Sequence, residues 1–197
     1  MKAILSFFAI TLPFFLFSQC GIYLTAEDYQ KGKLTDESDF LSYNSLTMTP
    51  KTFITVKPGG KKKKYTSSNC WGFRSYSQLP AKKGEKENPK IYTDSRIIKG
   101  RVWAIFGTGT LYSYRMGSFF EDKDKKLYFS AASGINYISF GPLGECHSLS
   151  DKKDLAKFLK VDDDFMKKAE KYDGTFDGII LYYNSVHPLT PPKKTIE

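Results

Sequence analysis

The sequence predicts an α+β fold, in which a mostly antiparallel sheet or small open barrel carries C-terminal helices packed on it. Short β-branched and aromatic segments separated by turn residues fill residues 50–141, at a spacing of about eight to twelve residues that is typical of antiparallel sheets. From residue 150 the apolar positions change to helical spacing, as in Leu155, Phe158 and Leu159. The chain has 197 residues, which is enough for one domain with a substantial core.

The first 18 residues have the composition of an export signal. A positive start at Met1-Lys2 precedes an almost wholly apolar stretch over residues 3–17, which is too short to stay in a bilayer as a stable span. We therefore expect cleavage after Ser18 and a mature protein in the periplasm or outside the cell. Cys20 leaves a second possibility open, namely a lipoprotein held in the envelope by a lipid on that thiol.

Residues 19–49 are expected to form an N-terminal extension with one short helix. Thr25 and Asp28 have the spacing of a capping box, in which a hydroxyl and a carboxylate each accept a hydrogen bond from an unpaired backbone N–H group. Gly32 suits the left-handed conformation that ends many helices. The helix is therefore one or two turns long.

The strands of a single domain over residues 50–187 are expected between residues 50 and 141. Pro58-Gly59-Gly60 predicts the turn of a hairpin. The expected strands, in chain order, cover residues 52–57, 62–67, 71–76, 91–98, 101–106, 111–116, 118–120, 127–131 and 136–140.

Helices are expected over residues 150–187. Ser150 or Asp151 can cap the first of them. A second helix would place four apolar residues along one side, Phe165, Ala169, Tyr172 and Phe176. Residues 179–183 are too short an apolar run for periodicity to decide between helix and strand. Residues 188–197 form a tail rich in Pro and Lys.

Several short motifs, in order along the chain, resemble those of a family of uncharacterised exported proteins of Bacteroidota-type bacteria. The motifs are Gly21-Ile22-Tyr23, Asp28-Tyr29, Lys33-Leu34, Gly72-Phe73-Arg74 and Tyr128-Phe129-Ser130. The resemblance implies export and brings no activity, cofactor or site residue with it.

The chain has three cysteines, Cys20, Cys70 and Cys146. In an oxidising compartment an odd number leaves one thiol unpaired or lipidated. If Cys20 carries a lipid, Cys70 and Cys146 remain as a candidate disulfide, which would stabilise the fold by about 3–5 kcal/mol in the chain-entropy model. The alternative is three buried thiols that act as small apolar side chains.

One segment has part of the pattern of a calcium-binding loop. Asp173, Thr175 and Asp177 occupy its first, third and fifth positions, and Gly178 the sixth. The twelfth position requires a bidentate Glu and holds Asn184 instead. The same residues also suit a helix end, a turn and a new N-cap, so the sequence predicts no cofactor and leaves calcium as the possibility to test.

The net charge is +9, and the surplus is clustered, most densely at Lys61, Lys62, Lys63 and Lys64. This run is either a solvated hairpin turn or a patch that binds an acidic polymer or lipid headgroups. Export argues against a nucleic-acid partner. An exposed aromatic face is expected from four tyrosines, Tyr112, Tyr114, Tyr128 and Tyr137, because Tyr suits surfaces that bind sugars or peptides.

No linear catalytic motif is recognisable in the sequence. The one pairing of nucleophile and base to consider is Cys70 with His147 or His187. Surplus lysine, many aromatic residues and few histidines favour a non-enzymatic envelope or secreted module that binds an envelope protein or an anionic polymer or lipid surface. The alternative is a secreted hydrolase whose residues form no linear motif.

Overall fold

The computed structural model describes residues 19–44, 53–78, 90–121, 127–173 and 175–188. Its larger sheet contains eight antiparallel strands in the spatial order β11-β10-β9-β8-β7-β6-β1-β2, and it does not close into a barrel. A separate sheet has the order β3-β4-β5. The predicted α+β class is confirmed.

The strands that make up the two sheets lie between Cys20 and Leu149. Their bounds are β1 (Cys20–Tyr23), β2 (Thr35–Ser38), β3 (Leu41–Asn44), β4 (Phe53–Val56), β5 (Lys63–Thr66), β6 (Gly72–Gln78), β7 (Lys90–Ile98), β8 (Arg101–Gly107), β9 (Leu111–Glu121), β10 (Leu127–Phe140) and β11 (His147–Leu149). The helices are α1 (Ala26–Gln30), α2 (Lys152–Leu159), α3 (Asp163–Asp173) and α4 (Phe176–Val186), with a 3-10 turn, η1, at Pro58–Gly60. The expected segments 111–116 and 118–120 form one strand, β9, and the expected segments 127–131 and 136–140 form another, β10.

The N-terminal segment belongs to the sheets and is not an extension of them. Strand β1 lies between β6 and β2, and its residues Ile22 and Tyr23 are fully buried. All four residues of β1 are buried, so this strand lacks the apolar–polar alternation that reveals a half-exposed strand. The expected capping box of α1 is confirmed, because Thr25 Oγ1 accepts from Asp28 N (3.1 Å) and Asp28 Oδ2 accepts from Thr25 N (3.3 Å).

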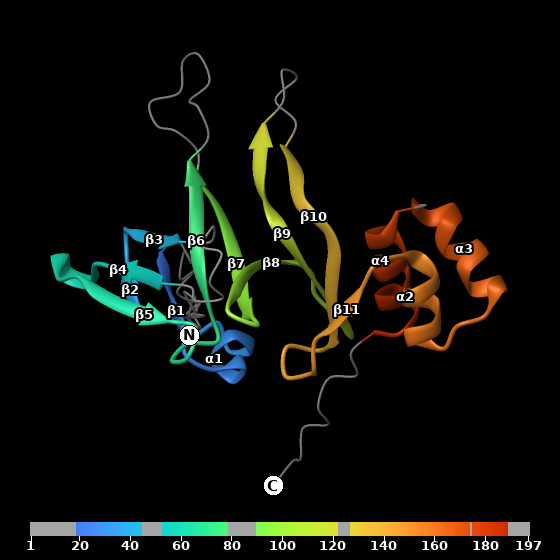
Figure 1. Ribbon diagram of the computed structural model, residues 1–197, viewed down its shortest axis with the longest axis horizontal. Coiled ribbons are helices and arrows are strands. Elements are labelled where there is room, and N and C mark those ends of the chain that lie inside the picture. Colours follow the sequence, from blue (N-terminus) through green and yellow to red (C-terminus); the bar gives the residue numbers. More distant parts are fainter. Residues whose placement is uncertain (1–18, 45–52, 79–89, 122–126, 174, 189–197) are drawn as a thin grey trace, which may run out of the picture.

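Both faces of the larger sheet are covered by apolar side chains. In β8 the consecutive residues Val102 and Trp103 are both buried, although neighbouring side chains on a strand point to opposite faces. Val102 packs with Ile54 and Val56 of the small sheet. Trp103 packs on the other side with a group of tyrosines. Figure 1 shows the small sheet and the three C-terminal helices at opposite ends of the molecule.

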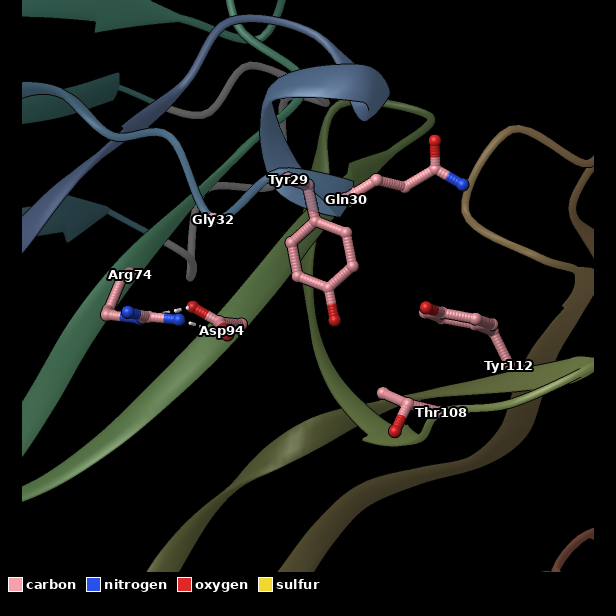
Figure 2. A pocket seen from close by; sticks show the side chains of 7 residues that line it. All are labelled: Tyr29, Gln30, Gly32, Arg74, Asp94, Thr108 and Tyr112. Carbon is pink, nitrogen blue, oxygen red and sulfur yellow. Dashed lines mark hydrogen bonds and ion pairs between the residues drawn. The ribbon is translucent and has the colours of Figure 1, made fainter. Parts of the chain in front are cut away.

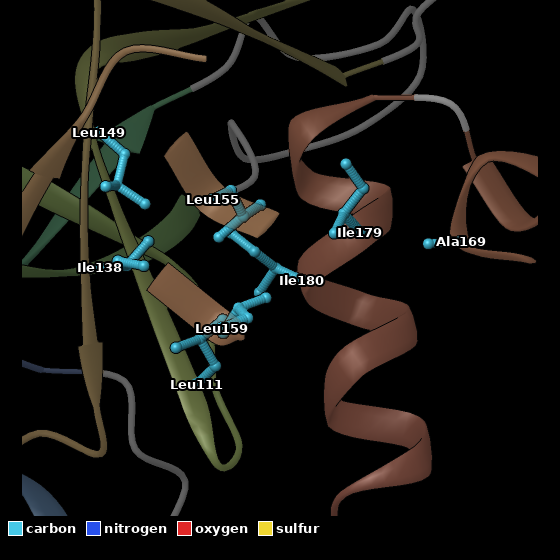
Figure 3. Close-up of a cluster of buried hydrophobic side chains, with 8 residues drawn as sticks. All are labelled: Leu111, Ile138, Leu149, Leu155, Leu159, Ala169, Ile179 and Ile180. Carbon is cyan, nitrogen blue, oxygen red and sulfur yellow. The ribbon is translucent and has the colours of Figure 1, made fainter. Parts of the chain in front are cut away.

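The C-terminal helices pack against β9, β10 and β11. Leu155 of α2 and Ile179 and Ile180 of α4 belong to one buried cluster with Leu111, Ile138 and Leu149 of the sheet (Figure 3). Each of the three helix side chains is at most 1% exposed, and burial of such a side chain contributes about 1.5–3 kcal/mol. The helices are therefore an integral layer of the fold.

The N-terminal caps of α2 and α4 decide two expectations for the C-terminal region. Asp151 caps α2 by accepting from Asp154 N (2.8 Å), as expected. The predicted second helix is too long, because Thr175 is the N-cap of a new helix, α4, whose first residue is Phe176. Tyr172 is 61% exposed and does not share a buried side with Ala169. The run over residues 179–183 is helical.

Candidate functional site

A pocket of about 400 Å³ opens between α1, strands β6 and β7, and the turn that joins β8 to β9. Its lining residues are Tyr29, Gln30, Gly32, Arg74, Asp94, Thr108 and Tyr112. Figure 2 shows the ring of Tyr29 extending from α1 toward Thr108 and Tyr112, with Arg74 and Asp94 on the neighbouring strands. The short helix α1 gives Tyr29 this position, because its capping box holds Tyr29 over the sheet.

Arg74 and Asp94 form an ion pair in the wall of this pocket. The register of β6 and β7 sets them directly opposite each other. Arg74 Nε donates to Asp94 Oδ1 (2.8 Å) and Nη2 donates to Oδ2 (2.9 Å), and Tyr23 Oη also donates to Oδ1 (2.9 Å). The hydrogen bonds that Arg74 donates to Asp94 raise the pKa of the Arg74 guanidinium. The two charges therefore compensate each other, and the wall is neutral overall.

Aromatic rings support the other side of the pocket. Tyr29 packs on Trp71 with ring centroids 4.9 Å apart, and its ring lies 6.2 Å from that of Tyr112. Burial raises the pKa of Tyr29 and that of Tyr112 above the ordinary value for tyrosine. Both phenols therefore remain protonated at neutral pH and can donate a hydrogen bond to a ligand.

The turn that carries Thr108 is fastened to α4. Asn184 Nδ2 donates to Leu111 O (2.8 Å), and Leu111 N donates to Asn184 Oδ1 (2.7 Å). A Cβ atom at Gly109 would lie 2.8 Å from the side chain of Asn184, so this close approach requires glycine. The C-terminal helix layer thus holds one wall of the pocket in place.

The cysteines do not form the expected disulfide. All three are free thiols in the structure, and Cys70 and Cys146 belong to separate apolar clusters. Cys70 Sγ donates to Thr66 O (3.2 Å), and burial raises the pKa of its thiol to about 11. Cys20 is 1% exposed at the start of β1. Cys20 and Cys70 are buried as small core side chains, as in the alternative that the sequence left open, whereas Cys146 is only partly buried.

The considered pairing of Cys70 with a histidine is not formed in the part of the chain that the structure describes. The ring of His147 packs on Phe158 (4.8 Å), and that of His187 packs on Tyr183 (4.5 Å). Cys70 instead lies in the cluster below the small sheet. Cys70 and a histidine therefore do not converge as nucleophile and base within the described residues.

The calcium-loop residues have structural partners. Thr175 Oγ1 caps α4 by accepting from Gly178 N (3.0 Å), and Asp177 Oδ2 pairs with Arg115 Nη2 (2.8 Å). Gly174 and the side chain of Asp173 lie outside the described part of the structure. Among the described residues no group of three His, Cys, Asp or Glu side chains is arranged to hold a metal ion.

The expectation of an exposed aromatic face is wrong for three of its four tyrosines. Tyr112, Tyr114 and Tyr137 are 8%, 0% and 9% exposed and form a core cluster with Trp103. The side chain of Tyr128 lies outside the described part. Tyr112 and Tyr114 are alternate residues of β9 and therefore face one side of the sheet, where they pack with Trp103, Tyr137 and, from α1, Tyr29.

The four lysines of the basic run follow the hairpin turn and are all exposed. Lys61 caps η1, and Lys63 and Lys64 lie in β5. Lys63 Nζ pairs with Asp36, which also accepts from Tyr65. The predicted turn at Pro58-Gly59-Gly60 is confirmed.

The sequence alone does not reveal the pair of Arg74 and Asp94, since Arg74 stands out only within the motif Gly72-Phe73-Arg74 and Asp94 not at all. They are twenty residues apart and meet through strand register, which leaves no linear motif. Tyr29 stands out in the sequence only within the motif Asp28-Tyr29, and Gly32 only as the end of a short helix. Within the described residues, no helix has both the length and the apolar character needed to cross a membrane. Comparison with family models, curated proteins and solved structures finds no match to this chain.

Proposed function

We propose that this protein is an exported, non-enzymatic binding module whose pocket takes a neutral ligand that carries hydroxyl groups and one apolar face, as a saccharide ring does. The observation that carries the proposal is the charge and chemistry of the pocket wall. Its guanidinium and carboxylate neutralise each other, while protonated phenols, the Thr108 hydroxyl and the Gln30 amide supply hydrogen bonds. Rings of Tyr29 and Tyr112 supply apolar surface.

A hydrolytic role has less support from the same residues. The lining contains neither a cysteine nor a histidine, and its one carboxylate already accepts hydrogen bonds on both oxygens from Arg74 and Tyr23. A general base must be able to reach a proton of the substrate or of water. Asp94 would first have to break the pairing that holds the wall together.

The proposed location outside the cytoplasm is supported by the composition of residues 1–18. Burial of Cys20 favours a form released after cleavage over one anchored by a lipid, since a lipid on that thiol would displace the start of β1. Partners are therefore proposed among envelope components. Cell fractionation with mass spectrometry of the N-terminus tests this part, and an intact Met1 in cytosolic material would contradict it.

Calorimetric titration with a panel of neutral mono- and disaccharides tests the pocket. We expect Tyr29→Ala to weaken binding about tenfold or more, because stacking and a hydrogen bond are both lost. Tyr172→Ala is the matched control, since Tyr172 is 61% exposed on α3 and lies outside the pocket lining. Equal affinity for Tyr29→Ala and the wild type, or no binding by the wild type, would count against the pocket. Turnover of a sugar that is abolished by Asp94→Asn would favour the hydrolase.

A further inference from the structure

The β4–β5 hairpin gathers lysines on one face, away from the pocket. Thr55 of β4 is paired with Lys64 of β5, and Val56 with Lys63. Continuing this antiparallel register places Lys57 opposite Lys62. Since side chains alternate along a strand, Lys57, Lys62 and Lys64 share the face opposite to the one on which Ile54 and Val56 are buried.

These three lysines have no carboxylate partner among the described residues. The hairpin's ion pair to a described acid joins Lys63 to Asp36, on the other face. Glu37 and Asp39 lie in and next to β2 and make no ion pair with the hairpin in the described part of the chain. Like charges directly opposite each other on neighbouring strands are destabilising, so an external anion would stabilise this arrangement.

The surroundings of the lysines are those of a surface that docks on a flat partner. The tip residues Gly59 and Gly60 have no atoms within 4 Å of where a Cβ would stand. Lys57 Nζ lies 4.5 Å from the ring centroid of Phe40, which is 41% exposed beside it. Figure 1 shows the hairpin projecting at the end of the molecule opposite to α2, α3 and α4. The tip is therefore accessible, and an aromatic side chain accompanies the charge.

We propose that the face formed by Lys57, Lys62 and Lys64 docks the protein on a membrane surface that exposes anionic lipid headgroups. Neighbouring positions on one face of a hairpin have Cβ atoms about 5–8 Å apart, so long lysine side chains at these positions can meet several headgroup phosphates of one leaflet at once. The exposed ring of Phe40 suits the boundary between headgroups and acyl chains. The proposal names a partner class for the envelope module and is independent of the pocket's ligand.

Partition onto vesicles tests the proposal with the processed chain. We would compare vesicles of phosphatidylcholine with vesicles that contain 30% phosphatidylglycerol, by sedimentation at 0.1 M salt. A lysine near an anionic surface raises partition about fivefold, so K57Q/K62Q/K64Q should lose up to roughly 100-fold of the wild type's binding to the anionic vesicles. Raising salt to 0.5 M should remove the wild type's preference, because exposed charges are then screened.

The matched control is K153Q/K157Q/K167Q, which removes three exposed lysines from α2 and α3. It should lose much less binding than the hairpin variant, and melting curves establish that both variants are folded. Equal loss in the two variants would show a nonspecific effect of net charge and overturn the proposal. The absence of any preference of the wild type for anionic vesicles would overturn it as well. Soluble polyphosphate that competes fully at an equal phosphate concentration would assign the face to a soluble polyanion and would also contradict membrane docking.

Discussion

Replacing either member of the Arg74–Asp94 pair should destabilise the protein strongly, because both charges are largely buried. The side chains of Arg74 and Asp94 are 16% and 23% exposed. Asp94→Ala removes two charge-assisted hydrogen bonds from Arg74 and one from Tyr23, and it leaves a guanidinium in a partly buried site. Such bonds contribute about 1.5–3 kcal/mol each when buried. Solvent screening at this exposure lowers the total, so we expect a loss of about 2–4 kcal/mol.

A double-mutant cycle measures the pair itself. Unfolding in urea would be followed for Arg74→Met, Asp94→Ala and the double variant, with the change in far-ultraviolet circular dichroism as the signal. We expect the double variant to be more stable than the sum of the single changes predicts, with a coupling energy of about 1.5–3 kcal/mol. A control cycle would use Lys168 and Asp164, an exposed pair on α3 at 59% and 70% exposure. This exposed pair should give a much smaller coupling energy than Arg74 and Asp94. A coupling for Arg74 and Asp94 as small as that of the control would refute the reasoning.

Three further predictions concern charge, thiol chemistry and packing. Hydrogen bonds from Lys63 and Tyr65 lower the pKa of Asp36, so this site adds stability above about pH 4 that is lost as pH falls through the lowered value. Asp36→Asn should thus melt earlier than the wild type at pH 7, and this difference in melting temperature should shrink as pH falls below about 4, whereas a constant difference would contradict the reasoning. Because the pKa of Cys70 is raised to about 11, its labelling by iodoacetamide should still accelerate between pH 9 and pH 11, and a plateau below pH 9 would show an exposed thiol. Gly72→Ala would bring a Cβ atom 2.2 Å from the Ser95 carbonyl oxygen. The free energy of unfolding in urea should therefore fall by about 3 kcal/mol or more. An unchanged free energy of unfolding would contradict the close approach of β6 and β7.

Local signals explain the parts of the fold that the sequence predicted well. The capping box of Thr25, the Asp151 cap and the Pro58-Gly59-Gly60 turn each depend on residues within a few positions of one another. Long strands such as β7 were located because they combine β-branched and aromatic residues over many positions. At these positions the structure is determined by residues that are close together in the sequence, so a short segment of sequence is sufficient to predict it.

The missing elements and the pocket depend on contacts between distant segments. Four buried residues of β1 show no alternation, and its pairing with β6 is decided some fifty residues later. The pocket brings Tyr29 together with Arg74 and Tyr112 from three separate elements. The tyrosines of β9 were expected outside because their polar hydroxyl groups suit a surface, but Arg96 and Ser139 satisfy the hydroxyl of Tyr114 within the core. Such pairings are settled by tertiary packing and leave no linear pattern.

The interior position of β1 has a practical consequence for anyone who produces the protein. A fusion partner or purification handle placed directly ahead of Cys20 would be joined to the end of a strand that has β6 and β2 as neighbours on its two sides, where a bulky group can disturb both pairings. Trimming the chain by three or four residues at that point would separate β2 from the rest of its sheet. Handles therefore belong at the opposite terminus, and any preparation should be assayed first for an intact β1.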